Sequence, residues 1–214
     1  MSLIFPRRCV LCGEPMPLFV KGGAMICDEC AARVRQHYRC TEGICIDGAD
    51  GAAAPLFYRG AVAEAMKRYK FSHYQHYADW FAAQMTAELA ARLEDWQPEV
   101  ITYVPIGMMR RYQRGYNQSE LLARAVAEQL KLPCRPLLSK RMFVTMQSQQ
   151  KSPVQRRRNA SRAFAPANQD ALNGKRVVLV DDVITTGATA AAACAVLRDM
   201  GAGRVYVLSA ARVR

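Results

Sequence analysis

Two adjacent carboxylates and a loop of small hydroxyl residues lie together in the segment VVLVDDVITTGAT, residues 177–189. The apolar run before Asp181 and Asp182 predicts a buried strand, and the loop after them has almost no side-chain bulk. Such a loop, where it leads into a helix, can direct backbone N–H groups and hydroxyls at an anion. The segment lacks the glycine patterns of nucleoside-triphosphate and dinucleotide sites. We therefore expect an anion-binding loop that contains Thr185, Thr186, Gly187, Ala188 and Thr189.

The two aspartates need their own explanation, because negative charge beside a phosphate site is unfavourable unless it has a partner. Vicinal ribose hydroxyls can donate hydrogen bonds to carboxylates, and a nearby Mg²⁺ can neutralise them. Ribose hydroxyls next to a 5′-phosphate describe 5-phosphoribosyl 1-pyrophosphate (PRPP). The alternative is an aspartate that caps the helix of a plain strand-to-helix turn, which accounts for one carboxylate but not for two.

Six of the eight cysteines precede residue 46, and four of them form two Cys-x-x-Cys pairs. This spacing lets each pair supply half of a tetrahedral zinc site, which would be structural because all four positions are filled by protein. Disulfides and redox chemistry are the alternatives, and the absence of a signal peptide argues against disulfides. Cys40 and Cys45 could form a third knuckle, fill a small core or replace one ligand. The predicted metal ligands are Cys9, Cys12, Cys27 and Cys30.

Positive charge is concentrated in the second half of the chain. Residues 101–214 hold 19 Lys/Arg and 6 Asp/Glu, a balance of +13, whereas residues 1–100 hold 11 and 12, a balance of −1. No carboxylate lies between Glu128 and Asp170, although nine basic residues do. This asymmetry indicates an anionic partner such as phosphate, pyrophosphate or nucleic acid, with a solubilising surface as the alternative.

The hydrophobic pattern predicts alternating strands and helices after residue 55. Strands are expected at 99–105, 176–180 and 204–211, and helices at about 62–69, 76–93, 117–130 and 188–200, with a capping box at Asn117 and Glu120. That order predicts an α/β fold with an open parallel sheet covered on both faces. The turn-prone segment 48–55 is expected to be a linker between a zinc-ribbon domain at 1–48 and an α/β domain at 49–214. With no run of about 18 apolar residues, we expect no membrane insertion and a cytoplasmic location.

The segment 177–189 resembles the PRPP-binding signature of type I phosphoribosyltransferases. The stretches VPIGMMRRYQRGYNQSELLARAVAEQL and QSQQKSPVQRRRNASRAF resemble the competence protein F (ComF/GntX) family. Together with the cysteine pairs, the resemblance covers nearly the whole chain. It implies a type I phosphoribosyltransferase-like open parallel sheet with a small N-terminal zinc ribbon.

The resemblance also implies roles for individual residues. Asp181 and Asp182 would hold the ribose 2′- and 3′-hydroxyls, and the loop 185–189 would bind the 5′-phosphate. Pyrophosphate would lie at the turn after the first strand, and residues 141–162 fall where these enzymes carry a loop that closes over the sugar. Thr185 stands where hypoxanthine-type enzymes carry a further acid, so no catalytic base is identified. The turn expected to bind pyrophosphate consists of Val104, Pro105, Ile106 and Gly107.

Three functions are compatible with these features. One is a PRPP-binding protein, with Mg²⁺ on the pyrophosphate, that acts in uptake or use of exogenous DNA together with competence or DNA-processing proteins and binds single-stranded DNA. The second is an active phosphoribosyltransferase with an unidentified acceptor, and the third is a non-catalytic adaptor that senses PRPP or a nucleotide. The cations expected to bind nucleic acid are Arg110, Arg111, Arg114, Arg156, Arg157 and Arg158, and the stacking residues are Tyr112, Tyr116 and Phe143.

Overall fold

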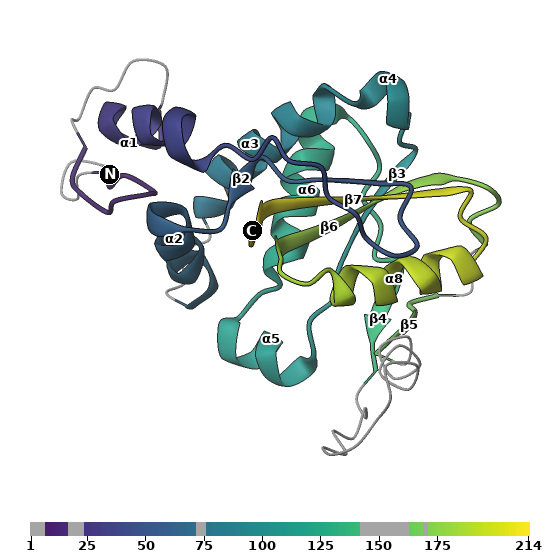
Figure 1. Ribbon diagram of the computed structural model, residues 1–214. Helices are drawn as coiled ribbons and strands as arrows, with labels where there is room; N and C mark the ends of the chain where they lie inside the picture. The colour runs from purple at the N-terminus through teal and green to yellow at the C-terminus, as the bar shows by residue number, and fades with distance from the viewer. Residues whose placement is uncertain (1–6, 17–23, 72–75, 142–162, 169–170) are drawn as a thin grey trace, which may run out of the picture.

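A sheet of parallel strands forms the centre of the fold (Figure 1). The computed structural model describes residues 7–16, 24–71, 76–141, 163–168 and 171–214. Within these ranges the strands run in the order β1 (Gly51–Ala53), β7 (Arg204–Arg212), β6 (Arg176–Ile184) and β3 (Val100–Tyr103), and β2 (Leu56–Phe57) also pairs with β7. Val178 of β6 lies opposite Ile101 on one side and Tyr206 on the other. The predicted open parallel sheet is confirmed.

Helices cover both faces of this sheet. They are α2 (Gly60–Phe71), α3 (Tyr77–Ala90), α4 (Leu93–Trp96), α6 (Gln118–Leu130) and α8 (Ala188–Asp199). Val178 and Val180 pack into one core together with side chains of α3 and α6. Val177 and Leu179 pack into a second core with α8. Because successive side chains of a strand point to opposite faces, the apolar start of β6 is buried on both sides.

Two elements that the sequence did not predict lie beyond the carboxyl ends of the central strands (Figure 1). One is α5 (Met108–Arg114), a short helix without buried residues that follows β3. The other is an antiparallel hairpin of β4 (Leu138–Lys140) and β5 (Phe164–Pro166). Most of the loop expected at 141–162, from residue 142 onward, falls outside the described residues.

The segment 48–55, expected to be a linker, contains the edge strand β1, which pairs with β7. A Cβ atom at Gly51 would lie 3.4 Å from Tyr206 and 3.5 Å from Trp96, whose rings stack with centroids 4.6 Å apart. A Cβ atom at Gly51 would thus make ordinary van der Waals contact with the stacked rings, and the turn-prone composition of this segment was misleading because the segment pairs with β7. The linker prediction is wrong, and the domain boundary at residue 48 stays a prediction.

Two further local predictions need correction. The strand β6 continues through both aspartates to Ile184, and Asp181 lies opposite Ser209 of β7 rather than beyond the sheet. Asn117 caps α6 as expected, with its side-chain oxygen 3.1 Å from the backbone nitrogen of Ser119. The carboxylate of Glu120 instead pairs with Arg124 at 2.9 Å, so no capping box is seen.

The N-terminal region packs directly against this framework. It contains α1 (Asp28–Arg33) and the π-helix η2 (Val34–Tyr38). Val10 and Leu11 are buried in the same core as Val62 and Met66 of α2. Among the helices that the structure describes, none combines the length and apolarity needed to cross a membrane.

Candidate functional site

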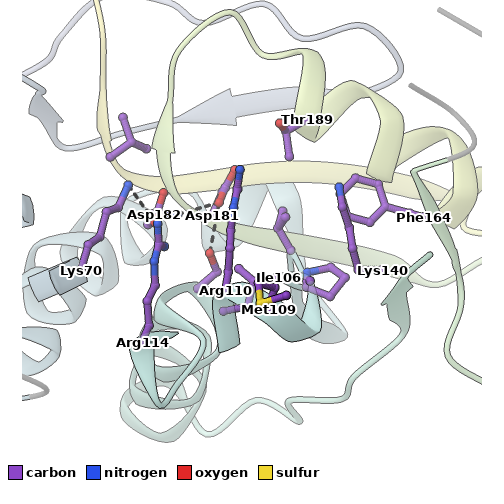
Figure 2. A pocket seen from close by; sticks show the side chains of 15 residues that line it. Lys70, Ile106, Met109, Arg110, Arg114, Lys140, Phe164, Asp181, Asp182 and Thr189 are labelled. Atoms are coloured by element: carbon purple, nitrogen blue, oxygen red, sulfur yellow. Dashed lines mark hydrogen bonds and ion pairs between the residues drawn. The ribbon is translucent and has the colours of Figure 1, made fainter. Parts of the chain in front are cut away.

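A cavity of about 690 Å³ lies where β3 and β6 end (Figure 2). Its walls come from α2, the turn after β3, α5, the start of α6, the β4–β5 hairpin, β6 and α8. In parallel sheets this edge is where ligands bind. The lining residues are Lys70, Val104, Pro105, Ile106, Gly107, Met109, Arg110, Arg114, Ser119, Lys140, Phe164, Asp181, Asp182, Val183 and Thr189.

The structure brings most, but not all, of the predicted site residues to this cavity. Both aspartates, the whole turn 104–107, Arg110, Arg114 and Thr189 line it. Thr185 and Thr186 line a separate recess of about 100 Å³ together with residues 43–45. Gly187, Ala188 and Arg111 are not among the lining residues. Residues 156–158 and Phe143 lie outside the part of the chain that the structure describes.

Asp181 is the buried member of the carboxylate pair, with 9% of its surface exposed. Its Oδ1 accepts hydrogen bonds from the Ser119 hydroxyl at 3.1 Å and from the backbone N–H of Asp182 at 2.8 Å. Burial and the neighbouring charge of Asp182 raise the pKa of Asp181 to about 7, despite these hydrogen bonds. The second oxygen of Asp181 forms no hydrogen bond with any described residue, so the carboxylate can accept further donors.

Asp182 has an ion-pair partner that the sequence analysis missed. The ammonium of Lys70, from the last turn of α2, lies 3.0 Å from Oδ2 of Asp182, and both side chains are largely buried. Figure 2 shows Lys70 beside this carboxylate, with a dashed line joining the two groups. No sequence signal marked Lys70, because its role depends on how α2 packs against the sheet.

The turn 104–107 is fixed by hydrogen bonds at its start. The backbone nitrogen of Val104 donates to the carbonyl of Val180 at 3.0 Å. The side-chain amide of Asn117 donates to the carbonyl of Val104 at 3.0 Å. Asn117 therefore caps α6 and also ties this turn to the helix that carries Ser119.

Two cations at the same end of the cavity form no ion pair with any described carboxylate. They are Arg110, on α5, and Lys140, at the end of β4. The ammonium of Lys140 lies 4.2 Å from the ring centroid of Phe164. Burial and the charge of Arg110 lower the pKa of Lys140. This end of the cavity is therefore prepared for an anion.

The aromatic residues predicted to stack on bases differ in accessibility. Tyr112 is 89% exposed on α5, next to the exposed Met108 and Met109. Tyr116 is buried, and its hydroxyl donates to the backbone carbonyl of Tyr69. The prediction of Tyr116 as a stacking residue is therefore wrong, because its ring belongs to the core.

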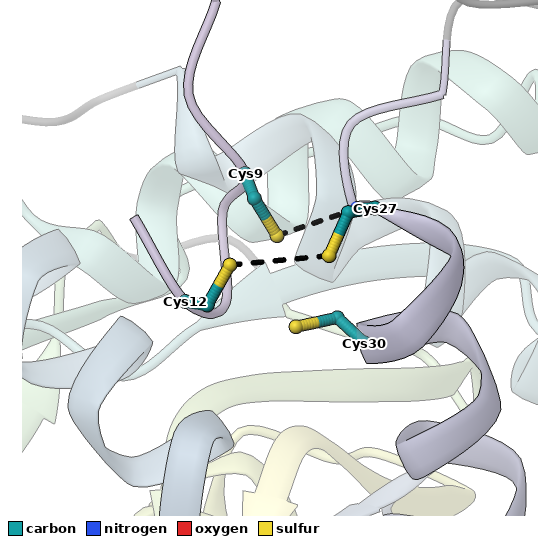
Figure 3. Close-up of side chains that lie close together, drawn as sticks. All are labelled: Cys9, Cys12, Cys27 and Cys30. Atoms are coloured by element: carbon teal, nitrogen blue, oxygen red, sulfur yellow. Dashed lines mark hydrogen bonds between the residues drawn. The ribbon is translucent and has the colours of Figure 1, made fainter. Parts of the chain in front are cut away.

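The four cysteines of the two Cys-x-x-Cys pairs converge in the N-terminal region (Figure 3). Their sulfur atoms all lie within 4.8 Å of one another, and the sulfurs of Cys12 and Cys27 are 3.9 Å apart. Tetrahedral ligation with Zn–S bonds of about 2.3 Å requires sulfur separations of roughly 3.8 Å. The residues present therefore fit a metal such as zinc. Cys40 and Cys45 are not part of this group.

Local backbone geometry supports this cluster. Gly13 closes the first knuckle with φ of 79°, and its N–H donates to the carbonyl of Cys9 at 2.9 Å. The backbone N–H of Cys27 points at the Cys9 sulfur, 3.4 Å away. Burial opposes ionisation of Cys9, but N–H groups of Cys12 and Cys27 outweigh it and lower the pKa of this thiol to about 7. A thiolate is the form that binds a metal.

Comparison with known proteins first defines the class. A family model described as a phosphoribosyl transferase domain matches residues 117–212, which include both aspartates and the loop 185–189. A solved structure of glutamine PRPP amidotransferase from B. subtilis, complexed with ADP and GMP, matches with 27% identity and a TM-score of 0.44, covering 62% of this chain and 26% of that one. The match over residues 117–212 and the open parallel sheet together show a phosphoribosyltransferase-like fold, preceded by a cysteine cluster consistent with a small zinc ribbon.

Two curated relatives are similar to this chain. Competence protein F of Haemophilus influenzae is 37% identical over 116 residues, which is 54% of this chain and 51% of that protein. The DNA utilization protein YhgH of Salmonella typhimurium is 29% identical over 228 aligned residues, 96% of each chain. The chain is thus similar to a competence protein and to DNA utilization proteins, in line with the resemblance that the sequence motifs indicated.

Proposed function

We propose that the cavity binds PRPP or a related phosphoribosyl compound, and that the protein acts in the use or uptake of exogenous DNA. The second part is supported by the names of the relatives, a competence protein and a DNA utilization protein. The first part rests on one observation above all. Two carboxylates lie in one cavity with the turn 104–107, Thr189 and unpaired cations.

Each part of the ligand has a suitable counterpart in this arrangement. Asp181 and Asp182 would accept hydrogen bonds from the ribose 2′- and 3′-hydroxyls. The turn 104–107, with Arg110 and Lys140 beside it, would bind the pyrophosphate. The 5′-phosphate would lie at the N-terminal end of α8, where Thr189 is the one residue of the loop 185–189 that lines the cavity. PRPP would bring Mg²⁺ with it on its pyrophosphate. Asp182 already has Lys70 as its ion-pair partner, so the Mg²⁺ need not be held by this carboxylate.

Calorimetric titration with PRPP and Mg²⁺ tests the site. The double variant Asp181→Asn with Asp182→Asn should lose at least about 100-fold in affinity, because two charge-assisted hydrogen bonds are weakened. The matched control is Asp199→Asn, at the exposed end of α8, which should bind as the wild type does. Unchanged affinity in the double variant would remove the site assignment.

Transfer of the phosphoribosyl group to an unidentified acceptor is the alternative to binding alone. Arg110 and Lys140 would stabilise the negative charge of departing pyrophosphate, which is the largest electrostatic demand of such a reaction. Thr185 supplies no base, and it does not line the cavity. Release of pyrophosphate from PRPP in the presence of candidate acceptors would establish turnover, and its absence across nucleobases and amines would favour a sensing role.

Single-stranded DNA binding is a second proposed activity, supported by the surface of α5. This helix presents Arg110, Arg111, Arg114 and the exposed ring of Tyr112. Cations along a strand and stacking on an aromatic ring are the usual means of binding single strands. We further propose that Arg156, Arg157 and Arg158 add phosphate contacts, and that the protein is cytoplasmic, where thiolate ligands stay reduced.

The salt dependence of affinity for a short single-stranded oligonucleotide tests this activity. We expect a steep loss of affinity between 50 and 200 mM salt, reduced in slope when residues 156–158 are replaced by alanine. The control Lys175→Ala changes an exposed charge on the far side of β6. A flat salt response, or equal slopes in both variants, would count against DNA binding.

A further inference from the structure

Three consecutive residues in the last turn of α2 connect three different parts of the molecule. Arg68 contacts the first cysteine knuckle, Tyr69 contacts the start of α6, and Lys70 contacts Asp182. No other described element reaches both the cysteine cluster and the cavity through side-chain hydrogen bonds or ion pairs. This turn therefore lies between the two candidate sites.

Arg68 holds the knuckle by its backbone. Its guanidinium donates to the carbonyls of Val10 at 3.1 Å and Leu11 at 2.6 Å. These two residues separate Cys9 from Cys12, so the position of both carbonyls depends on how the two thiolates are held. The Nε atom of Arg68 is already buried without a partner among the described residues, so loss of the two carbonyls would leave still more of this buried guanidinium unpaired.

Tyr69 holds the start of α6. Its hydroxyl donates to the carbonyl of Gln118 at 2.8 Å, and its own carbonyl accepts from the hydroxyl of Tyr116. Gln118 stands between Asn117, which holds Val104, and Ser119, which holds Asp181. Tyr69 is completely buried, so displacement of this turn of α2 would disturb both halves of the cavity.

We propose that the four-cysteine site and the cavity are energetically coupled through this turn of α2, with Lys70 as the residue that positions Asp182. A metal at the cysteines fixes the first knuckle, because small cysteine knuckles are ordered by their metal. The fixed knuckle holds Arg68, and the helix transmits that constraint to Tyr69 and Lys70 within one turn. Loss of the metal then makes the positions of Asp181 and Asp182 less fixed, although no residue that lines the cavity has been substituted.

Hydrogen–deuterium exchange tests the coupling without any ligand. Removing the metal from the full chain with a chelator should raise exchange at residues 117–121 and 181–184 by about tenfold, while residues 192–197, inside α8, stay protected. The variant Arg68→Met should show the same increase with its metal bound. The control Lys67→Met changes the neighbouring residue, whose ammonium pairs only with the exposed Glu64, and should exchange as the wild type does. Exchange changes confined to residues 7–71 would overturn the proposal.

Affinity for PRPP gives a second measure, which rests on the proposed function. Metal removal should weaken PRPP binding by about tenfold in the wild type. The loss should be much smaller in Arg68→Met, because this variant already lacks the hydrogen bonds between α2 and the first cysteine knuckle. Lys70→Met should retain stoichiometric zinc and also bind PRPP about tenfold more weakly. An increase in affinity would instead identify Lys70 as a competitor for Asp182 and overturn its positioning role. If the wild type does not bind PRPP, the proposed function fails while the exchange experiment still decides the coupling.

Discussion

The cysteine cluster and the cavity are assembled in different ways. All four sulfurs come from two knuckles between Cys9 and Cys30, and they meet one another within 4.8 Å. The cavity collects side chains from Lys70 to Thr189, carried by helices, strands and a hairpin that are distant in sequence. The cluster is a local structure that a metal completes, whereas the cavity depends on the packing of the whole chain.

The cysteine cluster and the cavity also differ in which of their polar groups lack a partner. The cluster has four donors directed at one point, so a metal would find a closed shell with no open position for chemistry. In the cavity, Asp181 retains a free acceptor and Arg110 and Lys140 lack ion-pair partners among the described residues. Unpaired groups of both signs in one cavity are what the proposed ligand, with its hydroxyls and negative charge, would need.

The largest effect is expected from breaking the cluster. Cys30→Ser removes a buried ligand, so we expect loss of the metal and destabilisation on the order of 5 kcal/mol. Zinc content and thermal unfolding of the purified protein measure it. The control Cys45→Ser changes an exposed cysteine outside the cluster. Retention of one zinc per chain by Cys30→Ser would contradict a four-cysteine site.

In the cavity we expect a smaller change, and it is a gain in stability rather than a loss. Because the pKa of Asp181 is raised from 3.8 to about 7, the folded protein holds an extra proton and loses stability as the pH rises from about 4 to 7. Asp181→Asn keeps the shape without the charge. We expect it to be more stable than the wild type at pH 8, by on the order of 1–3 kcal/mol, with the difference fading towards pH 4.

Urea unfolding at pH 5, 6 and 8 measures this difference. Asp199→Asn, which changes an exposed carboxylate, should follow the wild type at every pH. Stability that is equal in Asp181→Asn and the wild type at pH 8 would show that Asp181 carries no such penalty.

The smallest effect is expected at the junction of the turn 104–107 with α6. Asn117→Ala removes the helix cap and the hydrogen bond to Val104, so we expect a loss of about 1–2 kcal/mol in stability. Equilibrium unfolding measures it, with Gln129→Ala, an exposed position on the same helix, as the control. Equal stability of the two variants would mean that the turn is held by other contacts.

The sequence predicted the features that depend on local pattern. The spacing of the cysteines, the apolar start of β6 and the cap at Asn117 each follow from residues close together in the chain, and each appears in the structure. The family motifs also predicted the fold class, and they singled out the turn 104–107, which lines the cavity. These features could be predicted because each is set by the chain within one element or one turn.

Features that depend on packing between distant elements were missed. Lys70 and Ser119 contact the aspartates only because α2 and α6 lie against the end of β6. Tyr116 looked like a stacking residue, but the same packing buries it. The edge strand β1 was mistaken for a linker because its small residues resemble a turn, whereas its pairing with β7 depends on residues about 155 positions further along the chain.

The central claim is that the two aspartates recognise the vicinal hydroxyls of a ribose phosphate. Its most direct test is the ratio of affinities for ribose 5-phosphate and 2-deoxyribose 5-phosphate, measured by calorimetry on the wild type and on Asp181→Asn with Asp182→Asn. We predict that the wild type prefers the ribose compound by about tenfold or more, and that the double variant has no preference, because a hydrogen bond to a carboxylate contributes about 1.5–3 kcal/mol. Equal affinity of the wild type for both compounds would contradict the assignment of the carboxylates to the sugar.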